Sequence, residues 1–480
     1  MRLVPVIALC VLAACSKKPV EPATPDPAQT TEAPPIQVVN VDKLVEDAIA
    51  TAPGRIIMCD RDGEAAVFLE GTRVNFGTGS DCLNLLDPES GEHRKFTTAD
   101  LVDSYRLCDA LPNIHFVMSN GIPTDPATSS GQPLAPSLTY DLQMALMLEH
   151  TTKPIVFVTD DRATCQRAID MAAAVAGGHE ALVEQQHILL YSEPSSPLQQ
   201  SETALDKLLL MSESMLPIVH SPAPLMGGTG PITMASGLAL SLAEIQSSLV
   251  VHQLKNPGAP FVLGCGLHHM DMKSAQICYG SPEFQLTKAS IAEVGRWYGI
   301  PTWGYAGCTD AKVMDQQAAV EALLSVMMAK LSGANLIHDV GYLESGLLGS
   351  FDMLVMSDEI IGMAKRILRG IGVTPETLAV DVVEQVGPGG HYLTQEHTRT
   401  HFKTETWFPT LIDRQMRRTW EASGGQTMAE RVRAKVKEIM EHHEPLPIPA
   451  QVEGSLQEIV AQEKRSESTL RRRRDEAAAR

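Results

Sequence analysis

The sequence has few aromatic residues, fewer basic than acidic residues and no paired cysteine motif. Aromatic residues make up 5% of the 480 residues, and 39 basic residues stand against 58 acidic ones, which gives a net charge of −19. This charge argues against a nucleic-acid-binding protein, which needs a basic surface. The nine cysteines form no Cys-x-x-Cys pair. In a chain of this size that pattern predicts reduced core cysteines rather than a disulfide framework.

The apolar run at the N-terminus is too short to span a bilayer. It follows one basic residue and ends in Leu12-Ala13-Ala14-Cys15. Residues 1–15 therefore resemble a bacterial lipoprotein signal with Cys15 as the lipidated residue. Residues 16–40 are rich in Pro, Thr and Ala, a composition typical of an extended, disordered tether. This N-terminal pattern predicts export and a membrane anchor.

No Gly-rich dinucleotide fingerprint follows an early strand, which disfavours an open doubly wound sheet. Short apolar strands instead alternate with long amphipathic helices, the repeat of an α/β fold. The predicted strands are residues 114–119, 155–159, 188–191, 218–221, 261–264, 302–305 and 336–340. These seven strands come close to the eight of a closed barrel, and an eighth strand is not located. The open sheet remains the alternative.

The predicted strands and helices divide the chain into five parts. Residues 41–110 predict a helix followed by an antiparallel β-meander of residues 55–59, 65–69, 73–76 and 82–86, which would form a flap or cap. Residues 111–449 predict the α/β core, and this part becomes almost entirely helical after Asp352. Residues 450–480 predict a charged helical tail with a solvated basic run at 471–474.

Polar residues gather where two of the predicted strands end. Cys265, His268, His269, Asp271 and Lys273 follow one strand, and Cys308, Thr309, Asp310 and Lys312 follow another. The carboxyl ends of barrel strands are where such folds place their chemistry. Cysteine and histidine are also zinc ligands, but their spacing here matches no usual structural zinc pattern, so we predict no metal site.

Several stretches resemble one family, in that family's order. GYAGCTDAKVMDQQAAVE resembles the strand-six loop and helix of the trimethylamine methyltransferase family, and the other similar stretches are MDMKSAQICYGSPE, GANLIHDVGYLESGL, DEIIGMAKRILRGI and DVVEQVGPGGHYLTQEHT. The resemblance covers residues 41–449. It implies a TIM-type (β/α)8 barrel, here with a small antiparallel β-rich N-terminal flap and a helical C-terminal region. It also implies transfer of a methyl group from a methylated amine to a cobalt corrinoid (cobalamin) carried by a partner protein.

The resemblance also shows a departure from the family. The methylamine enzymes carry pyrrolysine in this loop, and the matching position here falls at Cys308 or within one residue of it. A thiol lacks the electrophilic imine of pyrrolysine. Relatives without pyrrolysine act, where known, on quaternary amines such as glycine betaine, whose methyl group is already activated. The resemblance therefore implies a quaternary amine as substrate, a corrinoid protein as partner and a cytoplasmic location, which conflicts with the lipobox at Cys15.

A quaternary ammonium group needs aromatic faces and a carboxylate. Trp303 and Tyr305 lie two apart on one predicted strand and point the same way. The predicted catalytic residues are Cys308, Asp310 and Glu344, and the predicted substrate-binding residues are Tyr279, Trp303, Tyr305, His338, Tyr342 and His391. Two alternatives stay open: an exported, lipid-anchored protein that binds quaternary amines without catalysis, and a thiol- or metal-dependent barrel enzyme that uses Cys308. A homo-oligomer is also possible.

Overall fold

A computed structural model describes residues 40–125 and 135–461 of the chain. The lipoprotein-like signal with Cys15, nearly all of the 16–40 tether and the basic run at 471–474 lie outside the described residues. The predictions made for them stay predictions.

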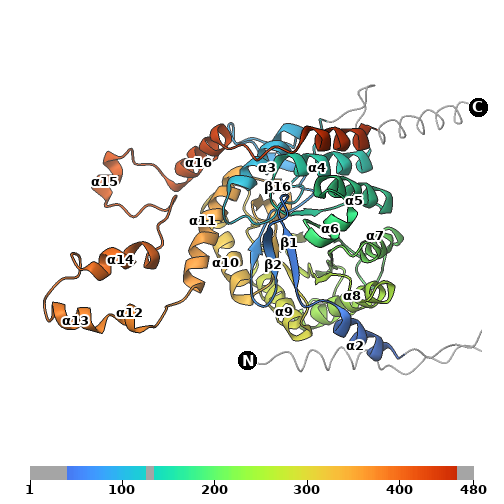
Figure 1. Cartoon of the computed structure of the whole chain (residues 1–480), viewed down its shortest axis with the longest axis horizontal. Helices are drawn as coiled ribbons and strands as arrows, with labels where there is room; N and C mark the ends of the chain where they lie inside the picture. Colours follow the sequence, from blue (N-terminus) through green and yellow to red (C-terminus); the bar gives the residue numbers. More distant parts are fainter. Residues whose placement is uncertain (1–39, 126–134, 462–480) are drawn as a thin grey trace, which may run out of the picture.

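Eight parallel strand segments close into a barrel (Figure 1). In ring order they are β3 (Asn75–Phe76), the segment at Phe116 and Val117, β6 (Ile155–Phe157), β7 (Ile188–Ser192), β8 (Ile218–His220), β10 (Phe261–Leu263), β13 (Trp303–Tyr305) and β14 (Leu336–His338). β14 pairs with β3, which returns the ring to its start. Single bridges complete the three remaining junctions: Gly77 to Phe116, Val117 to Ile155, and Leu263 to Thr302. The predicted TIM-type barrel is confirmed, and the open sheet is excluded.

β3 is the eighth barrel strand, which the sequence pattern did not reveal. The sequence pattern placed residues 73–76 in an antiparallel flap, whereas β3 is parallel to β14 and lies inside the barrel wall. The strand contains only two residues, too few to show any periodicity. With β3 as strand one, the barrel begins within the predicted cap, and β13 is the seventh strand rather than the sixth.

One helix follows each barrel strand and covers the barrel from outside (Figure 1). These helices are α3 (Thr98–Ala110), α4 (Pro136–His150), α5 (Arg162–Ala176), α7 (Glu202–Glu213), α8 (Met234–Lys255), α9 (Pro282–Tyr298), α10 (Gln316–Ser332) and α11 (Phe351–Leu368). By length and composition alone, α8 could cross a membrane. It packs here against α2 (Val41–Thr51), α7 and α9 as one helix of the outer ring, which accounts for its apolar surface.

An antiparallel hairpin fills the centre of the barrel at its amino end. It consists of β1 (Ile56–Cys59) and β2 (Ala65–Leu69), and Figure 1 shows it surrounded by the outer helices. Its side chains Ile56, Met58, Val67 and Leu69 are buried in one cluster with barrel side chains such as Val219. The amino end is therefore sealed by apolar packing, so a ligand can enter only from the carboxyl end.

Two small sheets extend the wall at the carboxyl end. One has the order β15–β16–β4–β5, formed by β15 (Tyr342–Leu343), β16 (Leu348–Gly349), β4 (Asn84–Leu86) and β5 (His93–Lys95). The other has the order β12–β11–β9, formed by β12 (Gln276–Ile277), β11 (His268–Asp271) and β9 (Leu225–Met226). These sheets build a rim around the mouth of the barrel.

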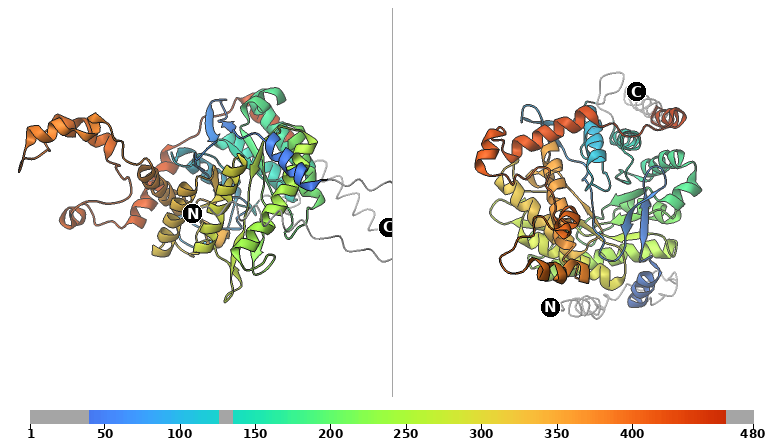
Figure 2. Two further views of the ribbon diagram at one scale, coloured as in Figure 1. Left: turned by 90° about the horizontal axis from the view of Figure 1, so that it is seen from below. Right: turned by 60° about the vertical axis from the view of Figure 1, so that its left-hand side comes forward.

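The chain beyond α11 leaves the barrel and then returns to it. α12 (Pro375–Leu378), α13 (Val380–Val386), α14 (Glu396–Glu405) and α15 (Arg417–Ala422) project to one side in Figures 1 and 2, and α16 (Met428–His442) packs back against α3 and α11. Packing also continues past Pro449, where the sequence predicted that it would end. Leu456 and Val460 lie in the main core cluster, so the first part of the predicted tail belongs to the folded body.

The seam between β14 and β3 depends on one buried amide side chain. Asn335 Nδ2 donates to the carbonyl oxygens of Glu70 (3.3 Å), Gly71 (3.3 Å) and Arg73 (3.1 Å). Its Oδ1 accepts from the backbone N–H of Thr302 at 2.9 Å. This one side chain ties β13 and β14 to the turn that leads into β3.

We expect Asn335→Ala to cost about 2–4 kcal/mol of the free energy of unfolding, because it leaves buried backbone groups without partners. Denaturant unfolding measures the change. The control is Asn84→Ala, whose side chain makes one exposed hydrogen bond, to the carbonyl of Leu347 at 3.2 Å. Equal losses in the two variants would contradict the role given to Asn335.

Candidate active site

Three carboxylates meet at the carboxyl end of the barrel. Asp81 follows β3, Glu193 follows β7 and Asp339 follows β14. Burial and the nearby Glu193 raise the pKa of Asp81 to about 6, and its Oδ1 has no hydrogen-bond partner among the described residues. Burial also raises the pKa of Glu193, with Asp339 adding to the effect. Like charges held close together and partly desolvated are typical of a functional site rather than a structural one.

The backbone at Asp339 is strained. Asp339 has φ 71°, in the left-handed region that a non-glycine residue rarely adopts. A Cβ at Gly79 would come within 2.3 Å of Asp339 Oδ1 and of the Tyr342 ring. The β3 loop therefore approaches Asp339 as closely as it does only because residue 79 is glycine.

Aromatic rings cluster beside the carboxylates, and those of Trp303 and Tyr305 are buried. The Trp303 ring lies 4.4 Å from His338 and 5.3 Å from Tyr191, measured between ring centroids. The Tyr305 ring lies 4.1 Å from His338. His338 Nδ1 lies 3.0 Å from Asp339 Oδ1. The structure thus brings together three predicted substrate-binding residues, Trp303, Tyr305 and His338.

One residue joins the aromatic wall to the carboxylates. The Tyr191 hydroxyl donates to Glu193 Oε1, while the Tyr191 ring packs against Trp303 and His338. Barrel residues surround Glu193 closely enough to raise its pKa, yet its side chain stays accessible to solvent through the mouth. An anionic group that faces solvent at the rim of an aromatic wall suits a cation that enters from the mouth.

A lysine already occupies the neighbouring aromatic faces. Lys288 Nζ lies 3.0 Å from the centroid of the Phe284 ring, 4.8 Å from that of Tyr305 and 5.9 Å from that of Tyr279. Burial lowers the pKa of Lys288 well below its usual value, although Asp339 opposes the shift. The predicted residues Tyr279 and Tyr305 therefore face an internal amine. Tyr191, which is half-buried, and Glu193, which is accessible to solvent, are the aromatic face and the carboxylate that an external cation could still reach, whereas Trp303 is buried.

The two predicted catalytic acids lie elsewhere. The Asp310 carboxylate accepts hydrogen bonds from the backbone N–H groups of Tyr279 (2.7 Å) and Gly280 (2.9 Å) and from Ser345 Oγ (2.7 Å). It thus holds the loops around the mouth together. Glu344 lies at the rim, partly exposed, with its Oε2 3.6 Å from His93 Nε2.

Cys308 lies beneath the mouth with only 2% of its surface exposed. Burial raises the pKa of its thiol well above the usual range, and the Asp339 and Asp310 carboxylates add to the shift. A nucleophilic cysteine needs the opposite shift, toward the thiolate. These surroundings suit a neutral thiol that fills space in a tight loop.

The two remaining predicted substrate-binding residues, Tyr342 and His391, lie in different parts of the molecule. Tyr342 is buried, and its hydroxyl donates to the carbonyl of Asn120 across the mouth. His391 is exposed and lies between α13 and α14, on the part of the chain that projects away from the barrel (Figure 1). His391 is not assembled with the other predicted residues within one chain.

The sequence patterns did not point to five residues of this site: Asp81, Tyr191, Glu193, Lys288 and Asp339. Glu193 and Asp339 stand at the ends of strands that were correctly predicted, so the rule applied to Cys308 and Asp310 could have found them. Asp81 was hidden because its strand was assigned to the flap. Lys288 comes from the inner face of α9, and only the packing of that helix shows where its amine lies.

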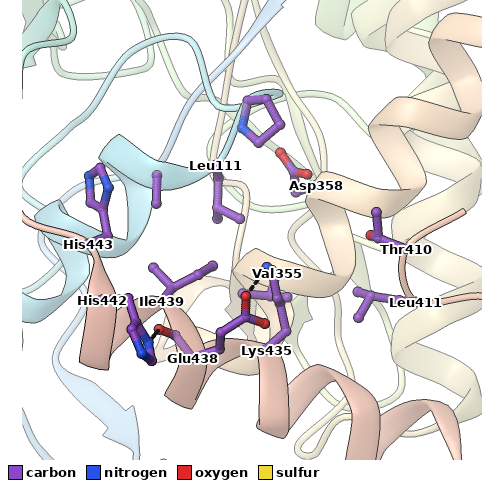
Figure 3. A pocket seen from close by; sticks show the side chains of 12 residues that line it. Leu111, Val355, Asp358, Thr410, Leu411, Lys435, Glu438, Ile439, His442 and His443 are labelled. Carbon is purple, nitrogen blue, oxygen red and sulfur yellow. Dashed lines mark hydrogen bonds and ion pairs between the residues drawn. The ribbon is translucent and has the colours of Figure 1, made fainter.

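No metal centre accompanies this site: across residues 40–125 and 135–461, no group of three or more His, Cys, Asp or Glu side chains could hold a metal ion. A separate cavity of about 400 Å³ lies among α3, α11 and α16 (Figure 3). Leu111 lines it and precedes the barrel strand at Phe116, so this cavity lies toward the amino end of the barrel. Two of its charged side chains, Lys435 and Glu438, pair with each other at 3.0 Å.

A family comparison supports the resemblance. Residues 36–468 match the model of the family described as trimethylamine methyltransferase (MTTB). The chain belongs to the trimethylamine methyltransferase family. It is a methyltransferase by this membership, and the match begins after the lipoprotein-like signal.

Two similar proteins are also named methyltransferases. Trimethylamine methyltransferase MttB of Desulfitobacterium hafniense is 32% identical, with 87% of this chain and 82% of that protein covered. Glycine betaine methyltransferase of Desulfitobacterium hafniense is 29% identical, with 88% and 86% covered. Among solved structures, monomethylamine methyltransferase of Methanosarcina barkeri aligns at 12% identity with a TM-score of 0.42, over 83% of this chain and 79% of that one.

We expect Asp81→Asn to stabilise the protein at pH 8 by up to about 3 kcal/mol and to have no effect at pH 4 or below. The pKa of Asp81 in the folded protein, about 6, lies above the usual aspartate value of 3.8, so the folded protein loses stability as pH rises through this range. Asparagine tolerates the φ of 57° at this position. Thermal unfolding at several pH values measures the effect. Asp310→Asn is the control and should destabilise at pH 8, because it disrupts three hydrogen bonds.

We expect Cys308→Ser and Cys308→Ala to keep the methyl-transfer rate within a few-fold of the parent. A nucleophile or metal ligand would lose on the order of 10² or more in rate. Single-turnover kinetics, with folding checked by circular dichroism, decide between these outcomes. A loss of that size in a folded variant would support the thiol-dependent alternative.

Proposed function

We propose that this enzyme transfers a methyl group from a quaternary amine to a corrinoid carried by a separate protein. The substrate ammonium would lie at the barrel mouth, beside Glu193 and against the Tyr191 ring, which packs on the buried Trp303. The observation that supports this placement is the hydrogen bond from Tyr191 to Glu193, because it joins an aromatic face to an anionic rim.

The surroundings of Cys308 support a quaternary rather than a tertiary amine. A tertiary amine needs activation before its methyl group can leave, and a neutral buried thiol offers no electrophile for that purpose. A quaternary nitrogen already carries the positive charge that makes its methyl group transferable. The protein then has only to position the cation, exclude water and present one methyl group at the mouth.

The acceptor must approach from the open end of the barrel. The β1–β2 hairpin closes the amino end, so the methyl group can be presented only past the rim sheets. A corrinoid bound there would supply the cobalt nucleophile. Chemistry that needs reduced cobalt favours the cytoplasm as the place of action, and the lipobox at Cys15 precedes the part of the chain that matches the family.

We expect Glu193→Gln to weaken binding of a quaternary amine about tenfold, a change of about 1.4 kcal/mol, because it removes the anionic partner of the cation. Titration calorimetry with wild type and variant measures the change. The same titrations with an uncharged isostere, carbon replacing nitrogen, should give weak binding that the substitution leaves unchanged.

Glu344→Gln provides the matched control, because this acid lies at the rim and faces His93. It should leave the affinity within about twofold of wild type. If Glu193→Gln binds the cation as well as the parent does, the proposed cation site is wrong. If wild type binds the amine but transfers no methyl group to a reduced corrinoid acceptor, the alternative of a binding protein is favoured instead.

A further inference from the structure

The junction between the first two barrel strands is completed by a side chain. The backbone N–H of His115 donates to the carbonyl of Phe76 in β3 at 2.6 Å. In return, the backbone N–H of Phe76 donates to Nδ1 of the His115 ring at 2.9 Å. In a strand ladder a backbone carbonyl normally accepts this second bond. The closure of the barrel at β3 therefore depends on which ring nitrogen of His115 carries a proton.

The hydrogen bond from Phe76 fixes the tautomer of His115. Burial and three nearby lysines lower the pKa of His115 to about 3, so the ring is uncharged at neutral pH. Because Nδ1 accepts, the single proton of the uncharged imidazole lies on Nε2. Nε2 lies 3.0 Å from Nζ of Lys365 on α11. The Nε2–H group can bond to this amine only by donating to a nitrogen lone pair, and only uncharged lysine has one.

The two hydrogen bonds of His115 cannot both persist when Lys365 is charged. An ammonium group has three N–H donors and no acceptor, so it meets the Nε2–H group donor to donor. If the ring proton moves to Nδ1, Nε2 can accept from the ammonium, but Nδ1 can no longer accept from Phe76. Protonation of Lys365 therefore removes either the bond to α11 or the bond that joins β3 to its neighbour.

A fixed positive charge lies close to this pair. Lys153, between α4 and β6, donates from Nζ to three backbone carbonyls, those of Cys108 (2.5 Å), Leu111 (2.7 Å) and Ile114 (2.6 Å). Three donated bonds use all three protons of a charged lysine. Ile114 is the residue next to His115, so this charge opposes a second positive charge at Lys365.

The other charged groups around Lys365 act in both directions. Burial lowers the pKa of Lys365 most, Lys330 on α10 and Lys153 lower it further, and Asp358 on α11 raises it, with a result of about 8. The neighbouring Arg366 turns away and donates to the carbonyl of Glu405 at 2.9 Å. Lys365 therefore exchanges its proton close to neutral pH, far below the range of an ordinary lysine.

We propose that Lys365 and His115 form a pH-sensitive link at the closure of the barrel. With Lys365 uncharged, both hydrogen bonds hold β3 in place, and uptake of one proton from water by Nζ loosens the junction between β3 and the segment at Phe116. The charged form gains as pH falls, so the link is lost as pH falls and restored as pH rises. β3 leads into the loop that carries Asp81, so the link acts on the position of one carboxylate of the mouth.

Hydrogen exchange of peptides that contain β3, corrected for the intrinsic effect of pH on exchange, tests the link. In wild type we expect their protection to rise about tenfold between pH 7 and pH 9.5, the value of one hydrogen bond. Lys365→Met carries no charge and should keep the high protection at both pH values. Lys365→Arg carries a permanent charge and should keep the low protection at both. A wild type without pH dependence, or the same pH dependence in both variants, would overturn the proposal.

Lys330→Met is the matched control. Lys330 acts on Lys365 through its charge, whereas the hydrogen bond to His115 comes from Lys365. Removing this neighbouring cation makes Lys365 easier to protonate, so the midpoint of the exchange transition should move to higher pH while both plateaus stay. A midpoint that stays in place, or moves to lower pH, would show that Lys365 is not the group that titrates.

Nitrogen-15 spectra of histidine-labelled wild type give a second readout, which needs no change at position 365. At pH 9.5 the His115 ring should show a protonated Nε2 and an accepting Nδ1, and His115→Gln identifies its signals by their loss. A proton on Nδ1 at this pH would overturn the link even if exchange at β3 changed with pH. Neither measurement uses substrate or corrinoid, so both are independent of the tests of the proposed function.

Discussion

The closure of the barrel at β3 is the constraint on which the rest of the structure depends. β3 contains two residues and lies between β14 and the segment at Phe116 and Val117, so it joins the two ends of a ring that spans most of the chain. The Asn335 amide holds the turn before β3 in place. Only this closure brings Asp81, from the first strand, to the same mouth as Asp339, from the last.

The mouth concentrates charge where water is partly excluded. The raised pKa values of Asp81 and Glu193 and the lowered pKa of Lys288 share one main cause, the removal of these groups from water. Desolvation of this kind reduces stability, and a protein retains it where function requires it. A cation bound there would relieve the repulsion between the carboxylates.

The barrel mouth and the helical extension after α11 differ in how tightly they are packed. The barrel end is built from short strands and strained loops that position side chains. Residues 370–426 form a loosely packed helical extension that carries several exposed apolar side chains. His391, expected at the active site, instead belongs to this extension.

The sequence by itself determined the repeating strand–helix pattern, seven of the eight barrel strands, the family, and the placing of Trp303 and Tyr305 on one strand near a polar loop. These features are local, since each depends on residues close together in the chain. Tertiary structure alone decided the eighth strand, because two residues carry no periodicity. It also decided that Asp310 binds loop backbone, that Cys308 is a buried thiol, and that Asp81, Glu193 and Asp339 share one mouth. The three carboxylates are each more than 100 positions apart in the chain, so only closure of the ring brings them together.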